Sequence, residues 1–117
     1  MRAIEVRGED CAILYLVLKR KWYDMIAHGS KRQEYRDYTN YWKRRIDNWV
    51  DQRKQGKFLV VGFSRGYRKA DLFFTACTVP IVVSNGRAPI AAWGEPATPH
   101  FAIYLDKPVK PIWCVWG

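Results

Sequence analysis

The sequence has few of the residues that build metal sites or disulfide frameworks. Its three cysteines, Cys11, Cys77 and Cys114, lie far apart without a Cys-x-x-Cys pair, and neither histidine, His28 or His100, has a partner at ligand spacing. An odd, scattered set of cysteines is unlike a disulfide scaffold or a zinc motif. We therefore expect no metal, no cofactor and a reducing, cytoplasmic compartment.

Long hydrophobic runs are also missing. The longest nearly apolar stretch, residues 72–83, has 12 residues, whereas a bilayer span needs about 20. Charged residues precede any apolar run at the N-terminus, which argues against a signal peptide. With 117 residues, 49% of them hydrophobic, the sequence predicts a single globular domain over 1–117 and no membrane partner; its oligomeric state stays open.

Acidic residues are scarce, and the imbalance is local. Residues 19–69 hold 15 Lys or Arg against 5 Asp or Glu, a net charge of +10, while the remainder has a net charge of −1. Tyrosines and tryptophans are interleaved with these cations. This combination suits a single-stranded nucleic acid, because cations bind its phosphates and flat rings stack on its unpaired bases. The alternative is that the cations form an ordinary solvated surface and that most of the aromatic rings lie in the core. The residues that we expect to bind nucleic acid are Lys19, Lys21, Lys31, Arg36, Tyr38, Arg44, Arg65, Tyr67 and Trp93.

The spacing of apolar residues predicts an α+β fold. Helices are expected around residues 22–26, stopped by Gly29, and around 42–52, capped by Thr39 or Asn40. We expect five to seven strands in a small, mostly antiparallel barrel or curled sheet, with the helices packed on one side. The expected strands are residues 13–18, 33–38, 58–63, 101–105 and 112–116, and residues 72–83 are expected as one long strand or a bent pair, with Pro80 at an edge or a kink. We also expect a loose arm or short edge at 1–11, a loop or bulge at 64–67, a hairpin turn at 84–87 and a C-terminal tail or last strand within 109–117.

The strand expected at 33–38 has no apolar face. Side chains alternate along a strand, so Glu34 and Arg36 share one face, while Tyr35 and Asp37 share the other. Such a strand either edges the sheet into water or lines a polar cleft. In a cleft, Glu34 would hold the Arg36 fork toward a phosphate or a base edge, and Lys31 would reach over the same mouth. Lys31 and Glu34 are therefore also the candidate catalytic pair.

The order Gly29-x-Lys31-x-x-Glu34-x-Arg36 resembles the signature of the ASCH domain, a member of the PUA-like superfamily. Segments 18–26, 41–46, 63–67 and 93–105 look like the other strands and helices of short phage and bacterial members, so the resemblance covers about residues 13–108. It implies a single PUA-like β-barrel of five to seven strands, with two or more short helices at its rim. It also implies a cleft along the signature strand and a partner that is RNA or a modified nucleoside or nucleotide.

One branch of that family resembles an N4-acetylcytidine amidohydrolase that uses a Lys, a Thr and a Glu. On this chain the Lys falls on Lys31 and the Thr falls on Glu34, so the hydroxyl is missing. The later Glu has no counterpart, because Asp71 is the only acid within residues 71–83. We therefore favour a binding module that grips RNA or another single-stranded nucleic acid.

Two other functions stay open. The first is a small hydrolase of a modified nucleoside, or a ribonuclease, with Lys31 in acid–base chemistry. The second is an interaction protein whose basic face docks an acidic partner. Ser64 is not expected to be a nucleophile, because no histidine lies near it in the sequence. Trp42 and Trp49 are expected in the core, and Trp113 and Trp116 in a last strand or docking tail.

Overall fold

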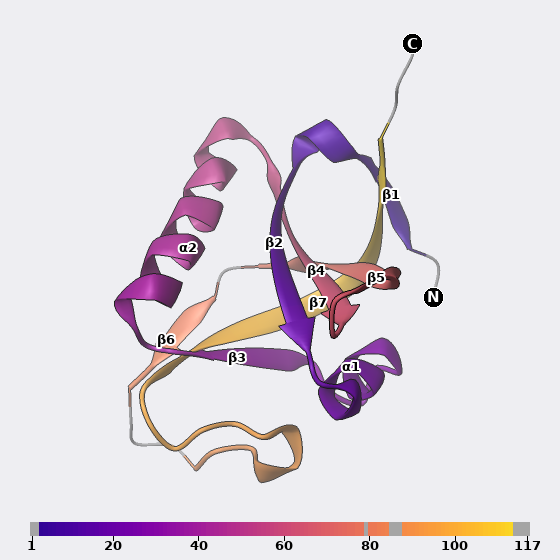
Figure 1. Cartoon of the computed structure of the whole chain (residues 1–117). Coiled ribbons are helices and arrows are strands. Elements are labelled where there is room, and N and C mark those ends of the chain that lie inside the picture. The colour runs from indigo at the N-terminus through magenta and orange to yellow at the C-terminus, as the bar shows by residue number, and fades with distance from the viewer. Residues whose placement is uncertain (1–2, 79, 85–87, 114–117) are drawn as a thin grey trace.

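The computed structural model describes residues 3–78, 80–84 and 88–113, apart from the side chain of Lys69 (Figure 1). The fold is a mixed α+β architecture, as the sequence predicts. The strands are β1 (Ile4–Arg7), β2 (Cys11–Leu18), β3 (Gln33–Asp37), β4 (Phe58–Arg65), β5 (Arg68–Cys77), β6 (Ile81–Val83) and β7 (His100–Ile112). The α-helices are α1 (Arg20–Ala27) and α2 (Asn40–Asp51), and short 3-10 turns lie at η1 (Gly8–Asp10), η2 (Gln52–Gln55) and η3 (Ala91–Trp93).

Both helices begin and end close to where the sequence predicts. Gly29 follows α1 with φ of 83°, a left-handed conformation that glycine adopts without steric cost. Thr39 is the N-cap of α2, and its hydroxyl oxygen accepts a hydrogen bond from the Trp42 N–H at 3.3 Å. These local signals fix the chain direction on each side of β3, the polar strand.

The strands form one sheet with an open path. Its order is β1-β7-β5-β4-β2, and β3 and β6 both pair with β7. The β1–β7 and β2–β4 pairs are parallel, and the others are antiparallel. Among the described residues no pairing joins β2 to β3, so the sheet is not closed and the expected barrel is not confirmed.

Strand β7 differs from the prediction of two separate strands at 101–105 and 112–116. It runs unbroken from His100 to Ile112 and carries Pro108 inside it. Pro108 lies opposite Thr75, next to the register shift between Thr75 and Cys77, so the missing N–H falls where the ladder is already irregular. The first half of β7 pairs with β3 and β6, and the second half pairs with β5 and β1.

Two short strands, β1 and β6, lie near the N-terminus and just before the expected hairpin turn. The segment expected as a loose arm or short edge forms β1, which pairs in parallel with the end of β7. Strand β6 pairs antiparallel with β7, with Val83 opposite His100. Residues 85–87 of the expected turn, and 114–117 of the expected tail, lie outside the described residues.

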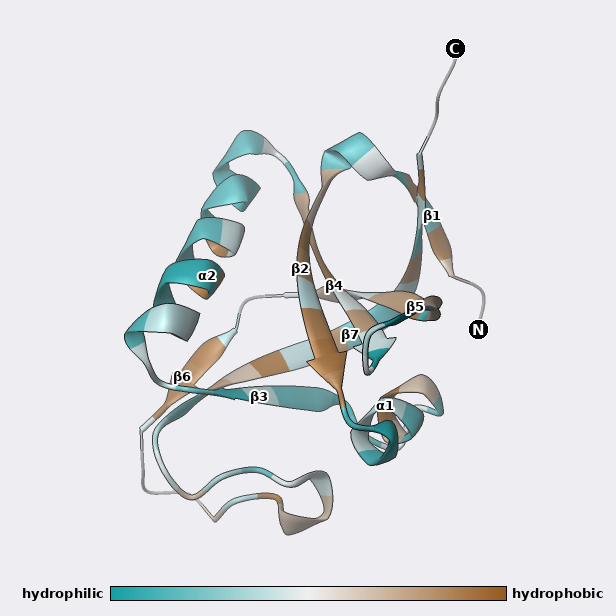
Figure 2. Cartoon of the chain, viewed as in Figure 1, coloured by the Kyte–Doolittle hydropathy of each residue, from teal (hydrophilic) through white to brown (hydrophobic). Residues whose placement is uncertain are grey.

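The main core lies between the sheet and the two helices. Ile46 and Trp49 of α2 and Ile26 of α1 pack with Leu16 of β2 and Phe63 of β4. Figure 2 shows the contrast between strands: β2 is hydrophobic over much of its length, whereas β3 is hydrophilic from end to end. The prediction that Trp49 is core is confirmed, since only 3% of it is exposed.

Side chains cover the open edge of β2, the last strand of the path. The Trp49 indole N–H donates to the Ala12 carbonyl at 2.8 Å, and Arg45 donates to the Tyr15 carbonyl at 3.3 Å. Arg36, from β3, donates to the Val17 carbonyl at 3.4 Å. An unpaired strand edge is a template for aggregation, and these donors replace the missing neighbour strand. Strands β2 and β3 thus face each other across a seam that side chains bridge.

Candidate functional site

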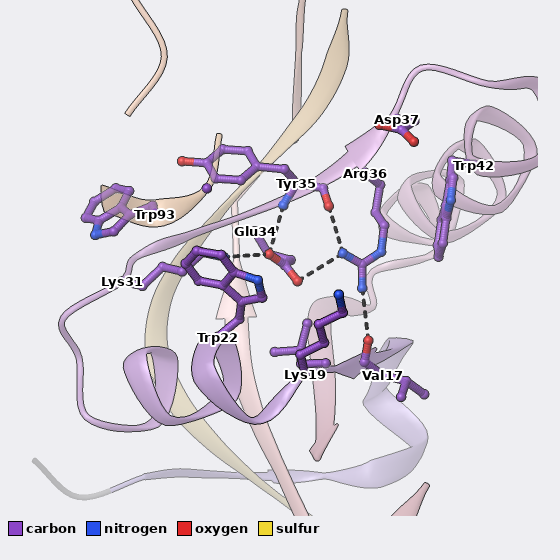
Figure 3. Close-up of a pocket in the computed structure, with 12 residues that line it drawn as sticks. Val17, Lys19, Trp22, Lys31, Glu34, Tyr35, Arg36, Asp37, Trp42 and Trp93 are labelled. Atoms are coloured by element: carbon purple, nitrogen blue, oxygen red, sulfur yellow. Dashed lines mark hydrogen bonds and ion pairs between the residues drawn. The ribbon is translucent and has the colours of Figure 1, made fainter. Parts of the chain in front are cut away.

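The seam opens into a cleft of about 470 Å³, which we call the seam cleft. One side is the end of β2 with the residue after it (Val17, Leu18, Lys19), and the floor is β3 (Glu34–Asp37) together with Lys31. Trp22 of α1, Trp42 of α2 and the Trp93–Gly94 turn complete the wall. Figure 3 shows these side chains converging from four separate parts of the chain. The volume lies within the usual range of small-molecule sites, roughly 300–1,000 Å³.

An ionic network forms the floor of the seam cleft. Glu34 accepts hydrogen bonds from Lys31 Nζ and Arg36 Nη1, both at 2.9 Å, and from the Tyr35 backbone N–H at 3.1 Å. The exposed fractions of the side chains are 2% for Lys31, 5% for Glu34 and 16% for Arg36. Both Glu34 oxygens are engaged, so this carboxylate holds the two cations in place.

Aromatic rings cover the buried part of this network. The Lys31 ammonium lies 4.3 Å from the centre of the Trp22 ring and 5.4 Å from that of Tyr35. In Figure 3 the Trp22 indole overlies the end of the Lys31 side chain. Cation–π attraction of this kind is worth about 2 kcal/mol when the cation is desolvated. Trp22 therefore acts as a cover that separates Lys31 from the open part of the cleft.

Arg36 is the exposed end of the network and spans the seam. Both N–H groups of Nη1 are used, by Glu34 Oε2 and by the Tyr35 carbonyl at 2.7 Å. Nη2 donates to Val17 on β2, so within the described part of the chain Nη2 and Nε each keep an N–H for a ligand. The guanidinium lies 5.1 Å from the Trp42 ring centre, and Arg45 lies 4.8 Å from the same ring.

Lys19 brings a second cation to the same place. Figure 3 shows its ammonium pointing toward the Arg36 guanidinium. Among the described residues Lys19 makes no ion pair, while the carboxylate beside Arg36 is already engaged. Two converging like charges repel each other, and an anion between them removes that repulsion.

The predicted residues fall into two groups. Lys19, Lys31, Glu34, Arg36 and Trp93 line the seam cleft, as the proposal of a polar cleft requires. Lys21 lies next to it, with its ammonium 4.7 Å from the Trp22 ring.

Four other predicted residues lie outside the cleft lining. Tyr38 packs on Phe101 with ring centres 5.2 Å apart, and Arg44 lines a shallow groove on the outer face of α2. Arg65 is bound to Asp71 at 3.1 Å, and Tyr67 is 92% exposed on the following turn. That turn borders the cleft rim, because the Gly66 N–H donates to the Leu18 carbonyl at 3.0 Å.

Several cleft residues were not predicted as ligand contacts. Trp42 is predicted as a core residue; it packs against the core but also lines the cleft. Trp22, on the apolar side of α1, likewise turns one face to the cleft. The sequence feature that could have indicated both tryptophans as cleft residues is their position beside the basic clusters Lys19–Lys21 and Lys43–Arg45. Asp37 and Gly94 gave no such signal.

Other classes of site find little support in the part of the chain that the structure describes. There, no three histidine, cysteine, aspartate or glutamate side chains gather where a metal ion would bind. None of the described helices has the length and apolar character needed to cross a bilayer.

Comparison of the chain with known protein families, with curated proteins and with solved structures found no match in any of the three.

Proposed function

We propose that this protein binds single-stranded nucleic acid, in particular RNA, through the seam cleft. The observation that carries the proposal is the pairing of unused cationic donors with aromatic walls inside one cleft of the seam. Arg36 and Lys19 present N–H groups, and Trp22, Trp42 and Trp93 line the same cleft. Nucleotides carry both features that such a cleft complements, an anionic phosphate and a flat base.

The state of each ring suggests how a nucleotide would lie. Two cations lie near Trp22, and two near Trp42. For Trp93 the described residues provide a hydrogen bond from its indole N–H to the Ser30 carbonyl at 2.8 Å and no cation over the ring. A phosphate would therefore lie between Arg36 and Lys19, and a base would stack on Trp93.

The proposal extends to the fold. The resemblance to ASCH domains, together with strands β2 and β3 facing each other, supports a PUA-like barrel that is left open at the seam. Arg36 crosses the gap where backbone pairing would close such a barrel. An open seam gives a ligand access to the strand edges, which closed ladders do not offer.

The experiment is a salt titration of binding to a fluorescent single-stranded RNA of about 10 nucleotides, a length in the usual range for such sites. We expect log K to fall linearly with log salt, by about 0.7 for each phosphate contact. Lys19→Gln should lower the slope by about one contact. The control is Lys54→Gln, which removes the same charge from a lysine that is 85% exposed beyond the far end of α2. A flat salt response, or equal effects of the two variants, contradicts the proposal.

A second candidate function is the hydrolysis of a modified nucleoside or of RNA, with Lys31 in acid–base chemistry. The buried Lys31–Glu34 pair beside a cleft favours it, because catalytic groups often occupy such environments. Glu34 already binds two cations, and Trp22 covers Lys31, so a reaction at Lys31 requires Trp22 to move. Lys31→Ala should abolish turnover of acylated nucleosides or RNA and leave RNA affinity largely intact; turnover that survives this change excludes Lys31.

A further inference from the structure

A turn far from β3 in the sequence holds the cover over Lys31. Gly94 has φ of 71° and lies so close to Trp22 that a Cβ on it would be 2.7 Å from the indole ring. Backbone bonds from Trp93 and Glu95 to Ile90 and from Gly94 to Ala91 close the turn, at 3.0–3.2 Å. Only a glycine fits this approach, and Trp22 is pressed between the turn and the Lys31 ammonium.

A buried hydrogen bond between Glu95 and His100 anchors this turn to the sheet. Glu95 Oε1 accepts the Ile90 N–H at 2.9 Å, and Glu95 Oε2 lies 2.8 Å from His100 Nε2 at the start of β7. Both side chains are almost fully buried, with 1% of Glu95 and 2% of His100 exposed. His100 Nδ1 lies 2.7 Å from the Thr98 carbonyl, which only accepts, so we assign a hydrogen to Nδ1, and Nε2 faces the Glu95 carboxyl group.

The same histidine supports the floor of the cleft. Its ring and the Tyr35 ring form a T-shaped contact with centres 5.4 Å apart, and the Tyr35 N–H is one of the three donors to Glu34. His100 is also the register partner of Asp37, at the end of β3. The Glu95–His100 pair therefore contacts both the wall that presses on Trp22 and the strand that carries the ionic network.

We infer that Glu95 and His100 are positioning residues of the seam cleft. They hold Gly94 against Trp22, and this contact keeps Trp22 over Lys31. The inference rests on the proposed function for its biological meaning, because it assigns to this pair the shape of the nucleic-acid cleft. Its physical content, the protection of one buried amine, is independent of any ligand.

The test is trace acetylation of the whole protein, with the modified lysines quantified by mass spectrometry. In the wild type, Lys31 should react at least about tenfold more slowly than the exposed Lys54 in the same sample. Trp22→Ala should remove this protection, and Glu95→Ala should remove most of it. Glu95→Gln should keep the protection of Lys31, because the amide oxygen accepts from the Ile90 N–H and the amide N–H donates to a neutral His100.

Two further measurements keep the test decisive. Circular dichroism shows whether Glu95→Ala folds, and Gly94→Ala is the second variant if it does not. Gly94→Ala disturbs the contact with Trp22 while the Glu95–His100 pair stays intact, so it should also expose Lys31 to acetylation. If Lys31 stays protected in a folded Glu95→Ala or Gly94→Ala variant, the positioning role is wrong. RNA affinity of the same variants is measured separately: loss of protection without any RNA binding in the wild type supports the positioning role and rejects the proposed function.

Discussion

Strands β3 and β4 show two different uses of burial within one sheet. Strand β4 buries Leu59, Val60, Val61 and Phe63 among other apolar side chains. Strand β3, with neighbouring Lys31, instead buries Glu34 and an ion network under aromatic rings. Apolar burial stabilises a small domain directly, whereas a buried ion pair stabilises it little or not at all after desolvation. The difference supports the proposal that β3 serves a binding site more than it serves the core.

The first way to test this contrast is to remove packing from β4. Phe63 is fully buried, and Phe63→Ala should lower the free energy of unfolding by about 3–5 kcal/mol. The measurement is urea unfolding followed by tryptophan fluorescence. RNA affinity of the folded fraction should stay at the wild-type level; a large loss of affinity would show that core and cleft are not separate.

The second way is to remove the centre of the network on β3. Glu34→Ala leaves Lys31 and Arg36 without their shared carboxylate, and we expect a loss of about 3–5 kcal/mol in the same urea experiment. Asp37→Ala is the matched control, since Asp37 is an exposed carboxylate of the same strand and should change stability by less than about 0.5 kcal/mol. Equal effects of the two variants would mean that the Glu34 network is not buried in solution.

The core near β4 also contains an ionisable group, the Cys77 thiol. Burial, reinforced by Asp106, raises the pKa of Cys77 to about 12, from an ordinary value of 9.0. The folded state therefore holds the thiol proton more tightly than the unfolded state, so this contribution is complete below pH 9 and is lost as the pH rises toward 12. Between pH 9 and about 10 the wild type should lose roughly 1 kcal/mol more stability than Cys77→Ala does. Identical pH profiles would contradict the raised pKa.

The smallest change in stability is expected when the whole ion pair is replaced. Lys31→Met combined with Glu34→Leu keeps similar side-chain volumes and removes the two most buried charges. Only the partly exposed Arg36 is left without its carboxylate, so the free energy of unfolding should fall less than in Glu34→Ala. Affinity for the RNA should nevertheless fall, because Arg36 loses the carboxylate that fixes its fork. A double variant that binds like the wild type would show that β3 has a purely structural role.

The helices and strands of this fold could be predicted from the sequence, but the contacts between them could not. Gly29, Thr39 and the apolar runs predicted both helices and most strands, because these signals act over a few residues. The continuity of β7 through Pro108 depends on an irregularity in its partner β5, which sequence periodicity does not reveal. For Glu34 and Arg36, polar alternation leaves an edge strand and a cleft equally open, and the resemblance to ASCH domains is what implies a cleft at Lys31, Glu34 and Arg36. The cover by Trp22 depends on Gly94, which is 72 residues away, and no local pattern indicates such a contact.

The most direct test follows the indole N–H signals in a ¹H–¹⁵N NMR spectrum during titration with single-stranded RNA. The account predicts that the signals of Trp22, Trp42 and Trp93 shift, since these rings line the seam cleft. The signal of Trp49 should stay in place, because this ring is buried and donates to the Ala12 carbonyl. Binding that leaves the three cleft signals unchanged would place the ligand elsewhere and contradict the account.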